Sequence, residues 1–289
     1  MVEYILGNYL VETGKITKEQ LTKALIKQDS VRIKLGLIAV AEGMMTLDQT
    51  AEVNRLQALM DMRFGDIAVQ KGYLTEEQVG KLLKKQGNTY LSFVQSLVDN
   101  DYLDMEDVDL VVNSFRLING YNNSEMDALK SDEPDRIVPL FMPEEGRQFT
   151  EIISTAIKSI IRLIDRHAYI GRAEMIDSFP AKDMISQSLE GKDGIICCLS
   201  EGNGALLKVC SVYGQEEFEQ LDADSLDAAG ELLNCINGLY AYGLSREGKF
   251  LELTPPDYTD VTAKAKTDIC RVPIFVGDKR FYFTVAELA

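Results

Sequence analysis

Residues 221–244 read LDADSLDAAGELLNCINGLYAYGL, and their apolar periodicity predicts a long amphipathic helix. The predicted core stripe consists of Leu226, Ala229, Gly230, Leu233, Ile236 or Asn237, and Tyr240. The other side carries Asp227, Glu231, Asn234 and Gly238 at positions i, i+4, i+7 and i+11, which predicts one continuous exposed face. A glycine inside a helix costs about 1 kcal/mol relative to alanine, so Gly230 and Gly238 predict close approach of another surface at one or both. On helix geometry alone, this face is ordinary solvated surface.

The segments around this helix predict an α+β domain. Residues 149–166, FTEIISTAIKSIIRLIDR, have helical spacing, whereas AEMIDSF (173–179), GIICCLSE (194–201) and GALLKVCSVY (204–213) predict strands. Further strands are predicted within 250–260 and 267–288, and Gly277-Asp278 is a two-residue hairpin signal. Strands with two long helices favour a mostly antiparallel sheet.

The first 118 residues contain an internal repeat of 29 residues. Three sets of positions keep this spacing: Gly7, Gly36 and Gly65; Gly14, Gly43 and Gly72; Gln28, Gln57 and Gln86. Each unit predicts a short helix, a glycine turn and a second helix, which Thr17 with Gln20 and Thr75 with Gln78 open as capping boxes. A fourth, degraded copy over 93–115 is typical of a capping repeat. We therefore expect an all-α array of helical hairpins.

The repeat pattern stops at residue 119. Residues 119–147 contain three prolines and many turn-forming residues, which predicts a linker. The expected organisation is a helical repeat domain over 1–118, a linker over 119–147 and an α+β domain over 148–289.

Composition limits the functions open to this chain. It has 289 residues, 46% of them apolar and 26% charged, which is typical of a folded protein. The net charge of −16 argues against nucleic acid, whose binding depends on Lys and Arg neutralising phosphates, and favours a cationic partner patch. No stretch approaches the roughly 18 apolar residues of a membrane span, and the start has no basic region before an apolar stretch, so we expect a cytoplasmic protein without a membrane partner. One histidine, His167, and five cysteines without a CxxC pair predict no metal site and no Cys/His nucleophile.

The predicted helix and the segment after it resemble a known family signature. Residues 227–258, DAAGELLNCINGLYAYGLSREGKFLELTPPDY, are similar to the signature of CheX-type chemotaxis phosphatases, in the CheC, FliY and CheX superfamily: Glu-x-x-Asn, a later Gly, a helix end, and a strand ending in Pro-Pro. Glu231, Asn234 and Gly238 fill the motif, and Pro255 and Pro256 form the later element. The resemblance extends more loosely over 149–288.

The resemblance implies a two-component or chemotaxis signalling protein that hydrolyses the aspartyl phosphate of a CheY-like response-regulator receiver. Asn234 would orient the attacking water and Glu231 would engage the receiver's lysine, with Asp227 and Gly238 on the docking face. The Mg²⁺ ion is expected on the receiver and no cofactor on this chain. Glu151 is followed by Ser154 rather than a second Glu-x-x-Asn, and Asn237 is polar where the family has a small apolar residue. A noncatalytic receiver-binding adaptor is the alternative, and pairing through sheet edges into a homodimer is undecided by these residues.

The third repeat resembles the cyclic di-GMP motif of MshEN domains. The matching positions are Arg63, Gly65, Gly72, Leu74 and Gln86. An arginine at the first of them could contact a guanine or a phosphate, which makes a cyclic di-GMP sensor a further alternative. The first two repeats have Ile5 and Lys34 at that position, and capping with core packing explains the glycines and leucine equally well. The repeats are therefore also compatible with a protein-protein module.

Overall fold

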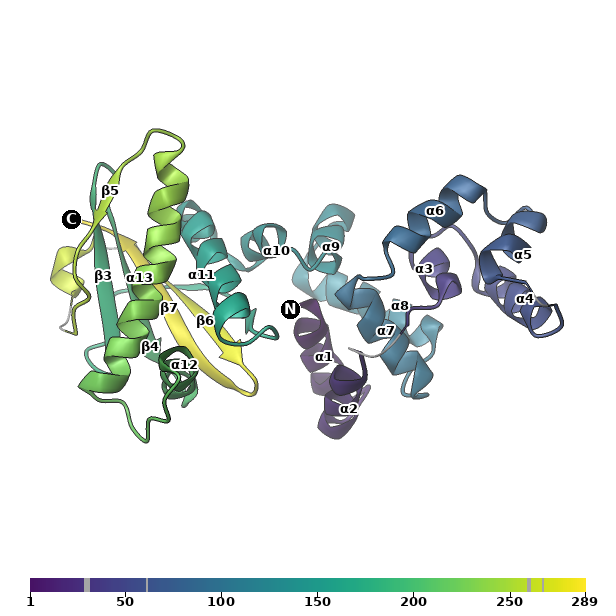
Figure 1. The fold of residues 1–289 in the computed structure, drawn as a ribbon, viewed down its shortest axis with the longest axis horizontal. Helices are drawn as coiled ribbons and strands as arrows, with labels where there is room; N and C mark the ends of the chain where they lie inside the picture. Colours follow the sequence, from purple (N-terminus) through teal and green to yellow (C-terminus); the bar gives the residue numbers. More distant parts are fainter. Residues whose placement is uncertain (29–31, 61, 259–260, 267) are drawn as a thin grey trace. The chain divides into compact units, whose positions relative to one another are not determined.

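The computed structural model describes residues 1–28, 32–60, 62–258, 261–266 and 268–289. The chain divides into two compact units, Val2–Asp132 and Glu133–Ala289 (Figure 1). The first unit is all helical and the second combines helices with an antiparallel sheet, so the predicted α+β class is confirmed. Parts of the predicted C-terminal strands, at 259–260 and 267, lie outside the described residues.

The N-terminal unit is a series of short helices. Their bounds are α1 Val2–Glu12, α2 Lys18–Gln28, α3 Leu35–Ala41, α4 Leu47–Gln57, α5 Phe64–Gln70, α6 Glu76–Lys84, α7 Thr89–Asp99, α8 Met105–Asn119 and α9 Asn123–Lys130. Each sequence repeat corresponds to one helix pair. The predicted capping box at Thr75 is present, since its hydroxyl accepts from the Gln78 amide at 3.2 Å while the Gln78 side chain accepts from the Thr75 amide at 2.8 Å.

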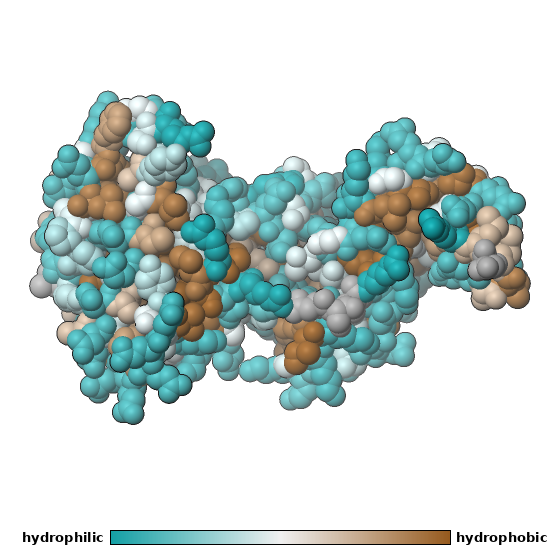
Figure 2. All heavy atoms as spheres, in the orientation of Figure 1, coloured by the Kyte–Doolittle hydropathy of each residue, from teal (hydrophilic) through white to brown (hydrophobic). Residues whose placement is uncertain are grey.

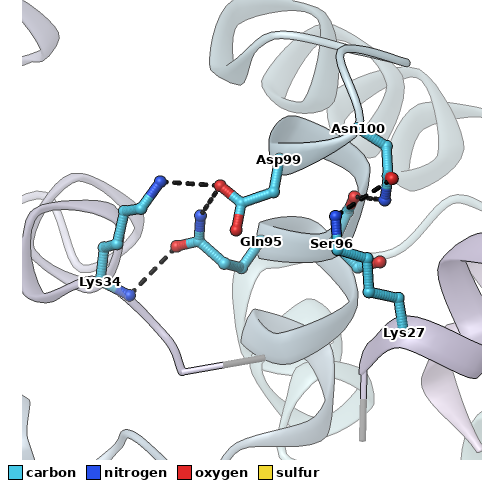
Figure 3. Close-up of polar contacts among 6 residues, drawn as sticks. All are labelled: Lys27, Lys34, Gln95, Ser96, Asp99 and Asn100. Carbon is cyan, nitrogen blue, oxygen red and sulfur yellow. Dashed lines mark hydrogen bonds and ion pairs between the residues drawn. The ribbon is translucent and has the colours of Figure 1, made fainter. Parts of the chain in front are cut away.

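Helix α7 of the degraded copy is largely buried and holds its neighbours by polar contacts (Figure 3). Gln95 accepts from the Lys34 amide at 3.1 Å and donates to Asp99 at 2.8 Å, and Asp99 also pairs with the Lys34 ammonium at 2.7 Å. Ser96 donates to the carbonyl oxygen of Ala24 at 2.9 Å. The fourth copy therefore ties α2 and the start of α3 together.

The predicted linker over 119–147 is mainly helical in the structure. Helix α9 closes the first unit, and α10, Pro134–Phe141, opens the second, followed by the 3-10 turn η1, Glu144–Phe149. The turn-forming residues act as helix caps: Asn122 caps α9, and Pro134 occupies the first turn of α10, where a missing amide hydrogen costs nothing.

Seven strands of the described residues form one antiparallel sheet in the C-terminal unit, with the order β1-β6-β7-β4-β3-β5 and β2 beside β6. Their bounds are β1 Tyr169–Ile170, β2 Glu174–Ile176, β3 Met184–Gly191, β4 Ile195–Glu201, β5 Leu251–Leu253, β6 Ile269–Val276 and β7 Lys279–Glu287. The predicted hairpin at Gly277-Asp278 is confirmed as the β6–β7 turn, where Gly277 has a φ of +67°.

Helices α11, Thr150–Leu163, α12, Ala205–Gly214, and α13, Ala223–Ser245, pack together, and α13 lies against β3, β4 and β5 (Figure 1). The two long predicted helices are confirmed as α11 and α13. The short 3-10 helix η2, Thr262–Lys264, precedes β6. Because strand side chains alternate, Ile185 faces α13 while Met184 joins a second apolar cluster that includes Phe179 and Val261.

Other elements of the C-terminal unit also differ from the sequence prediction. Residues 204–213, predicted as a strand, form helix α12, because the Glu201 carboxylate accepts from the amides of Gly202, Gly204 and Leu206 and thereby satisfies the start of a helix. The strand β3 was not predicted, because its centre is polar: Ser186, Gln187 and Ser188 are buried there.

Candidate functional site

Helix α13 begins where its sequence supplies a cap. The Asp222 carboxylate accepts from the Ser225 amide at 3.1 Å, and the Ser225 hydroxyl accepts from the Asp222 amide at 2.8 Å. The hydrogen bond from the Ser225 amide lowers the pKa of Asp222, because it favours the charged carboxylate. The predicted core stripe is largely confirmed: Ala229, Gly230, Leu233, Ile236 and Asn237 are buried, whereas Leu226 and Tyr240 are half-buried.

The predicted exposed face of α13 is confirmed as a surface. Asp227, Glu231 and Asn234 are exposed and Gly238 is half-buried. Asp227 accepts from the Tyr258 hydroxyl at 3.3 Å, so its carboxylate already has a neighbour within the chain. Within the described part of the chain, the Glu231 carboxylate has no hydrogen bond or ion pair, and it is therefore free to meet a cation from outside.

The side chain of Asn234 accepts a hydrogen bond from Gln187, a buried residue that the sequence analysis did not single out. Gln187, which is 1% exposed on β3, donates from Nε2 to Asn234 Oδ1 at 2.8 Å and to the Thr254 carbonyl oxygen at 2.8 Å. Asn237 Nδ2 in turn donates to Gln187 Oε1 at 2.8 Å. The available signal was a glutamine between two serines in a stretch that ends in a turn, which does not identify a strand. The polar Asn237, noted as unusual for the family, thus has a partner in the chain.

The two glycines of α13 have different surroundings. A methyl group on Gly230 would lie 3.2 Å from Pro256 Cβ and 3.4 Å from Ile185 Cγ1, so this glycine allows the Pro-Pro segment to pack against the helix. A methyl group on Gly238 would meet no described atom within 4 Å. Of the close approaches that the two glycines predicted, the described chain supplies only the one at Gly230.

Acidic residues surround the start of this helix. The loop before α13 and its first turn expose Glu216, Glu217, Glu219, Asp222 and Asp224, and Figure 2 shows hydrophilic residues gathered there. These carboxylates, together with that of Glu231, make this surface negatively charged.

The residues of the MshEN-like motif have structural roles in the N-terminal unit. Gly65 is buried, and a methyl group there would lie 3.0 Å from Val79 Cγ1. Gly72 has a φ of +72°, a left-handed turn, and Leu74 is buried in the core. Gln86 donates to the carbonyl oxygen of Ile33 at 3.2 Å, whereas Arg63 is exposed at the start of α5. Of these five residues, Arg63 and Gly72 are exposed, and Arg63 is the one whose side chain could meet a ligand.

Other classes of site find little support within the described ranges. No group of three or more His, Cys, Asp or Glu side chains among the described residues could hold a metal ion. Burial raises the pKa of the Cys210 thiol, and likewise that of Cys270, to about 12, so these thiols stay protonated. In the part of the chain that the structure covers, no helix is long and apolar enough to cross a membrane.

No protein-family model matches this chain. It is 34% identical over 89 residues to the CheY-P phosphatase CheX of Thermotoga maritima, and the match covers 30% of this chain and 57% of that protein. The matched region thus spans little more than half the length of this curated relative. The CheX relative confirms the predicted resemblance to the CheC, FliY and CheX superfamily, whereas the MshEN-like resemblance of the repeats stays a prediction.

Solved structures of low sequence identity are also similar to about half of the chain. A CheC-like superfamily protein from Shewanella sp. PV-4 has 14% identity and a TM-score of 0.42, covering 51% of this chain and all of that protein. A chain of the CheX–CheY–BeF3–Mg²⁺ complex from Borrelia burgdorferi has 15% identity and a TM-score of 0.41, covering 48% of this chain and 96% of that one.

Proposed function

We propose that this chain docks on the phosphorylated receiver domain of a CheY-like response regulator and accelerates hydrolysis of its aspartyl phosphate. The observation that carries the proposal is the pairing, on one exposed face of α13, of the free Glu231 carboxylate with the Asn234 carboxamide held by Gln187. The CheX of Thermotoga maritima, which is named as a CheY-P phosphatase, supports the same reaction class.

The proposed reaction needs few catalytic groups from this chain. A water oxygen forms a bond to phosphorus in line with the aspartyl oxygen, the bond from phosphorus to that oxygen breaks, and its electron pair leaves on the aspartyl carboxylate. The water's proton passes to the released phosphate. The receiver is expected to supply Mg²⁺ and a lysine, so this chain needs only to position the water, which is the role proposed for Asn234.

Docking is the proposed role of the rest of the face. Glu231 would pair with a receiver lysine in a charge-assisted hydrogen bond, which fixes the register of the two proteins. The bare backbone at Gly238 allows the receiver to approach α13 closely, and Asp227 lies on the same stripe. The acidic residues before α13 favour encounter with a basic surface.

The test is the loss of phosphate from a receiver loaded with a small phosphodonor, measured with and without the purified chain. We expect faster loss with the wild-type chain and none of this acceleration with Asn234→Ala, because the group that positions water is removed. The Asn234 side chain is exposed and Gln187 keeps its bond to Thr254, so the variant should unfold at the wild-type temperature.

The same assay separates hydrolysis from simple binding. Receiver binding without faster phosphate loss would identify the noncatalytic adaptor, and unchanged decay across a panel of cognate receivers would reject the enzymatic proposal. Glu231→Gln is the matched docking variant: it should raise the concentration of chain needed for half-maximal acceleration while leaving the rate at saturation near the wild-type value.

A further inference from the structure

Three carboxamides form a short relay under the exposed face of α13. Asn237 is fully buried, Gln187 is 1% exposed and Asn234 reaches the surface. Consecutive members are joined by hydrogen bonds of 2.8 Å, from Asn237 to Gln187 and from Gln187 to Asn234. The relay therefore leads from the core of the unit to the side chain proposed to act on water.

The Thr254 carbonyl oxygen determines which way each amide points. A backbone carbonyl can only accept a hydrogen bond, so the Gln187 atom that lies 2.8 Å from it must be the nitrogen. The same nitrogen faces Asn234, so the inward atom of Asn234 must be its oxygen. Gln187 Oε1 then faces Asn237 and accepts from Nδ2. The orientation of all three amides follows from one backbone group.

That backbone group is itself fixed by the sheet. The Thr254 amide donates to the Ser188 carbonyl oxygen at 3.0 Å, and the Thr254 hydroxyl accepts from the Ser188 amide at 3.2 Å. Both Ser188 and Gln187 belong to β3, so the reference carbonyl and the amide it orients are held by the same strand.

We propose that Gln187 is a positioning residue, supported by Asn237, that holds Asn234 with its oxygen inward and its NH₂ group toward the partner. This inference rests on the proposed function, whose reacting atoms belong to the receiver. Asn234 then acts as a hydrogen-bond donor, through one N–H to a lone pair of the attacking water and through the other to a phosphoryl oxygen. It does not accept the water's proton.

A purely structural role would also explain why buried amides are paired. The relay is not fully satisfied, however, because Asn237 Oδ1 is buried and has no hydrogen-bond partner among the described residues. An unpaired buried acceptor costs stability, and a small apolar residue at this position would avoid the cost. The presence of Asn237 is better explained by the orientation that its Nδ2 imposes on Gln187.

The discriminating experiment measures the rate of phosphate loss against the concentration of chain, for the wild type and for Gln187→Met. Methionine fills similar space without donating, so Asn234 is free to rotate. We expect the rate at saturation to fall by about 10-fold to 100-fold, the order of loss for a misplaced catalytic group. The half-saturating concentration should stay within about 2-fold, because the surface charges and Gly238 that form the docking face are unchanged.

Asn234→Asp tests the direction of the amide. An aspartate can still accept from Gln187 but presents an oxygen outward, so we expect the acceleration to be lost as in Asn234→Ala. Wild-type acceleration by Asn234→Asp would overturn the donor role. A Gln187→Met chain that keeps the wild-type rate at saturation would overturn the positioning role while leaving the proposed function intact.

Thermal unfolding of each variant checks the fold. If Gln187→Met does not fold, Asn237→Ala frees Gln187 Oε1 without removing the glutamine, and it should also lower the rate at saturation. A wild-type rate at saturation for that variant would overturn the positioning role as well. No acceleration by the wild-type chain itself would overturn both the proposed function and this inference.

Discussion

Gly238→Ala is predicted to stabilise the protein and weaken its docking at the same time. Gly238 lies inside α13, and a methyl group there would meet no described atom within 4 Å. Alanine should therefore contribute its full helix propensity, about 1 kcal/mol, to the free energy of unfolding. For a unit of this size, that corresponds to an increase in the unfolding temperature of roughly 2–4 °C.

The same methyl group should interfere with a receiver that packs on this face. Overpacking a close contact costs about 1–3 kcal/mol, and each 1.4 kcal/mol is about tenfold in affinity. We therefore expect the half-saturating concentration in the dephosphorylation assay to rise by roughly 5-fold to 150-fold. A clash within the chain would lower stability, so a gain in stability combined with weaker docking would show that the methyl group meets the receiver and not this chain.

Two other glycines of α13 are matched controls. Gly243→Ala would place its methyl group 3.9 Å from Glu151 Oε1, an ordinary contact on the side facing α11, so it should add stability without affecting docking. Gly230→Ala would press on Pro256 at 3.2 Å, so the propensity gain should be cancelled or exceeded. Unchanged docking by Gly238→Ala would refute the role of this position, and a lowered unfolding temperature would refute the claim that the space above it is open.

Three further predictions concern the fold itself. Asp222→Ala should lower the unfolding temperature at neutral pH, because it removes the cap of α13, whereas Asp222→Asn keeps the cap. Since the pKa of Asp222 is lowered in the folded state, its contribution to stability is present above the ordinary aspartate pKa and is lost as pH falls through the folded value. Plots of unfolding temperature against pH for the wild type and Asp222→Ala should therefore converge in acid. Glu201→Ala removes the acceptor of the Gly202 and Gly204 amides in the turn before α12 and of the Leu206 amide in its first turn, and it should cost about 1–3 kcal/mol in denaturant unfolding. Gly72→Ala should destabilise the N-terminal unit by about 1 kcal/mol, because the residue has a φ of +72°. Gly80→Ala should stabilise the unit by a similar amount, because Gly80 lies inside α6 with no described atom within 4 Å of the added methyl group. Equal effects of the two substitutions would contradict this conformational explanation.

Local patterns predicted the elements whose determinants are adjacent in sequence. The spacing of Asp227, Glu231 and Asn234 predicted the exposed face of α13, because a helix places i, i+4 and i+7 on one side. Thr75 and Gln78 predicted a capping box that the structure contains. In each case the residues that decide the outcome lie within two turns of the same helix.

Elements that depend on distant partners could not be predicted in this way. Strand β3 was not predicted, because the hydrogen-bond partners of its polar residues Ser186, Gln187 and Ser188, which are Thr254 and Asp257, lie far along the chain. Helix α12 has the valines and cysteine of a strand, and its start depends on the Glu201 carboxylate folding back onto the glycine turn. Tertiary hydrogen bonds decided both outcomes against local propensity.

The Pro-Pro segment shows why the candidate site is larger than the helix motif. Pro255 and Pro256 have no amide hydrogen, so neither can donate to β3 and strand β5 ends at Leu253. The Ser188 amide donates to the Thr254 hydroxyl, so the Thr254 carbonyl oxygen is left to accept from Gln187. Pro256 packs at Gly230, where an added methyl group would lie 3.2 Å from Pro256 Cβ, and this contact brings the segment against α13. The segment that follows strand β5 therefore also supplies the carbonyl group from which the orientation of Asn234 follows.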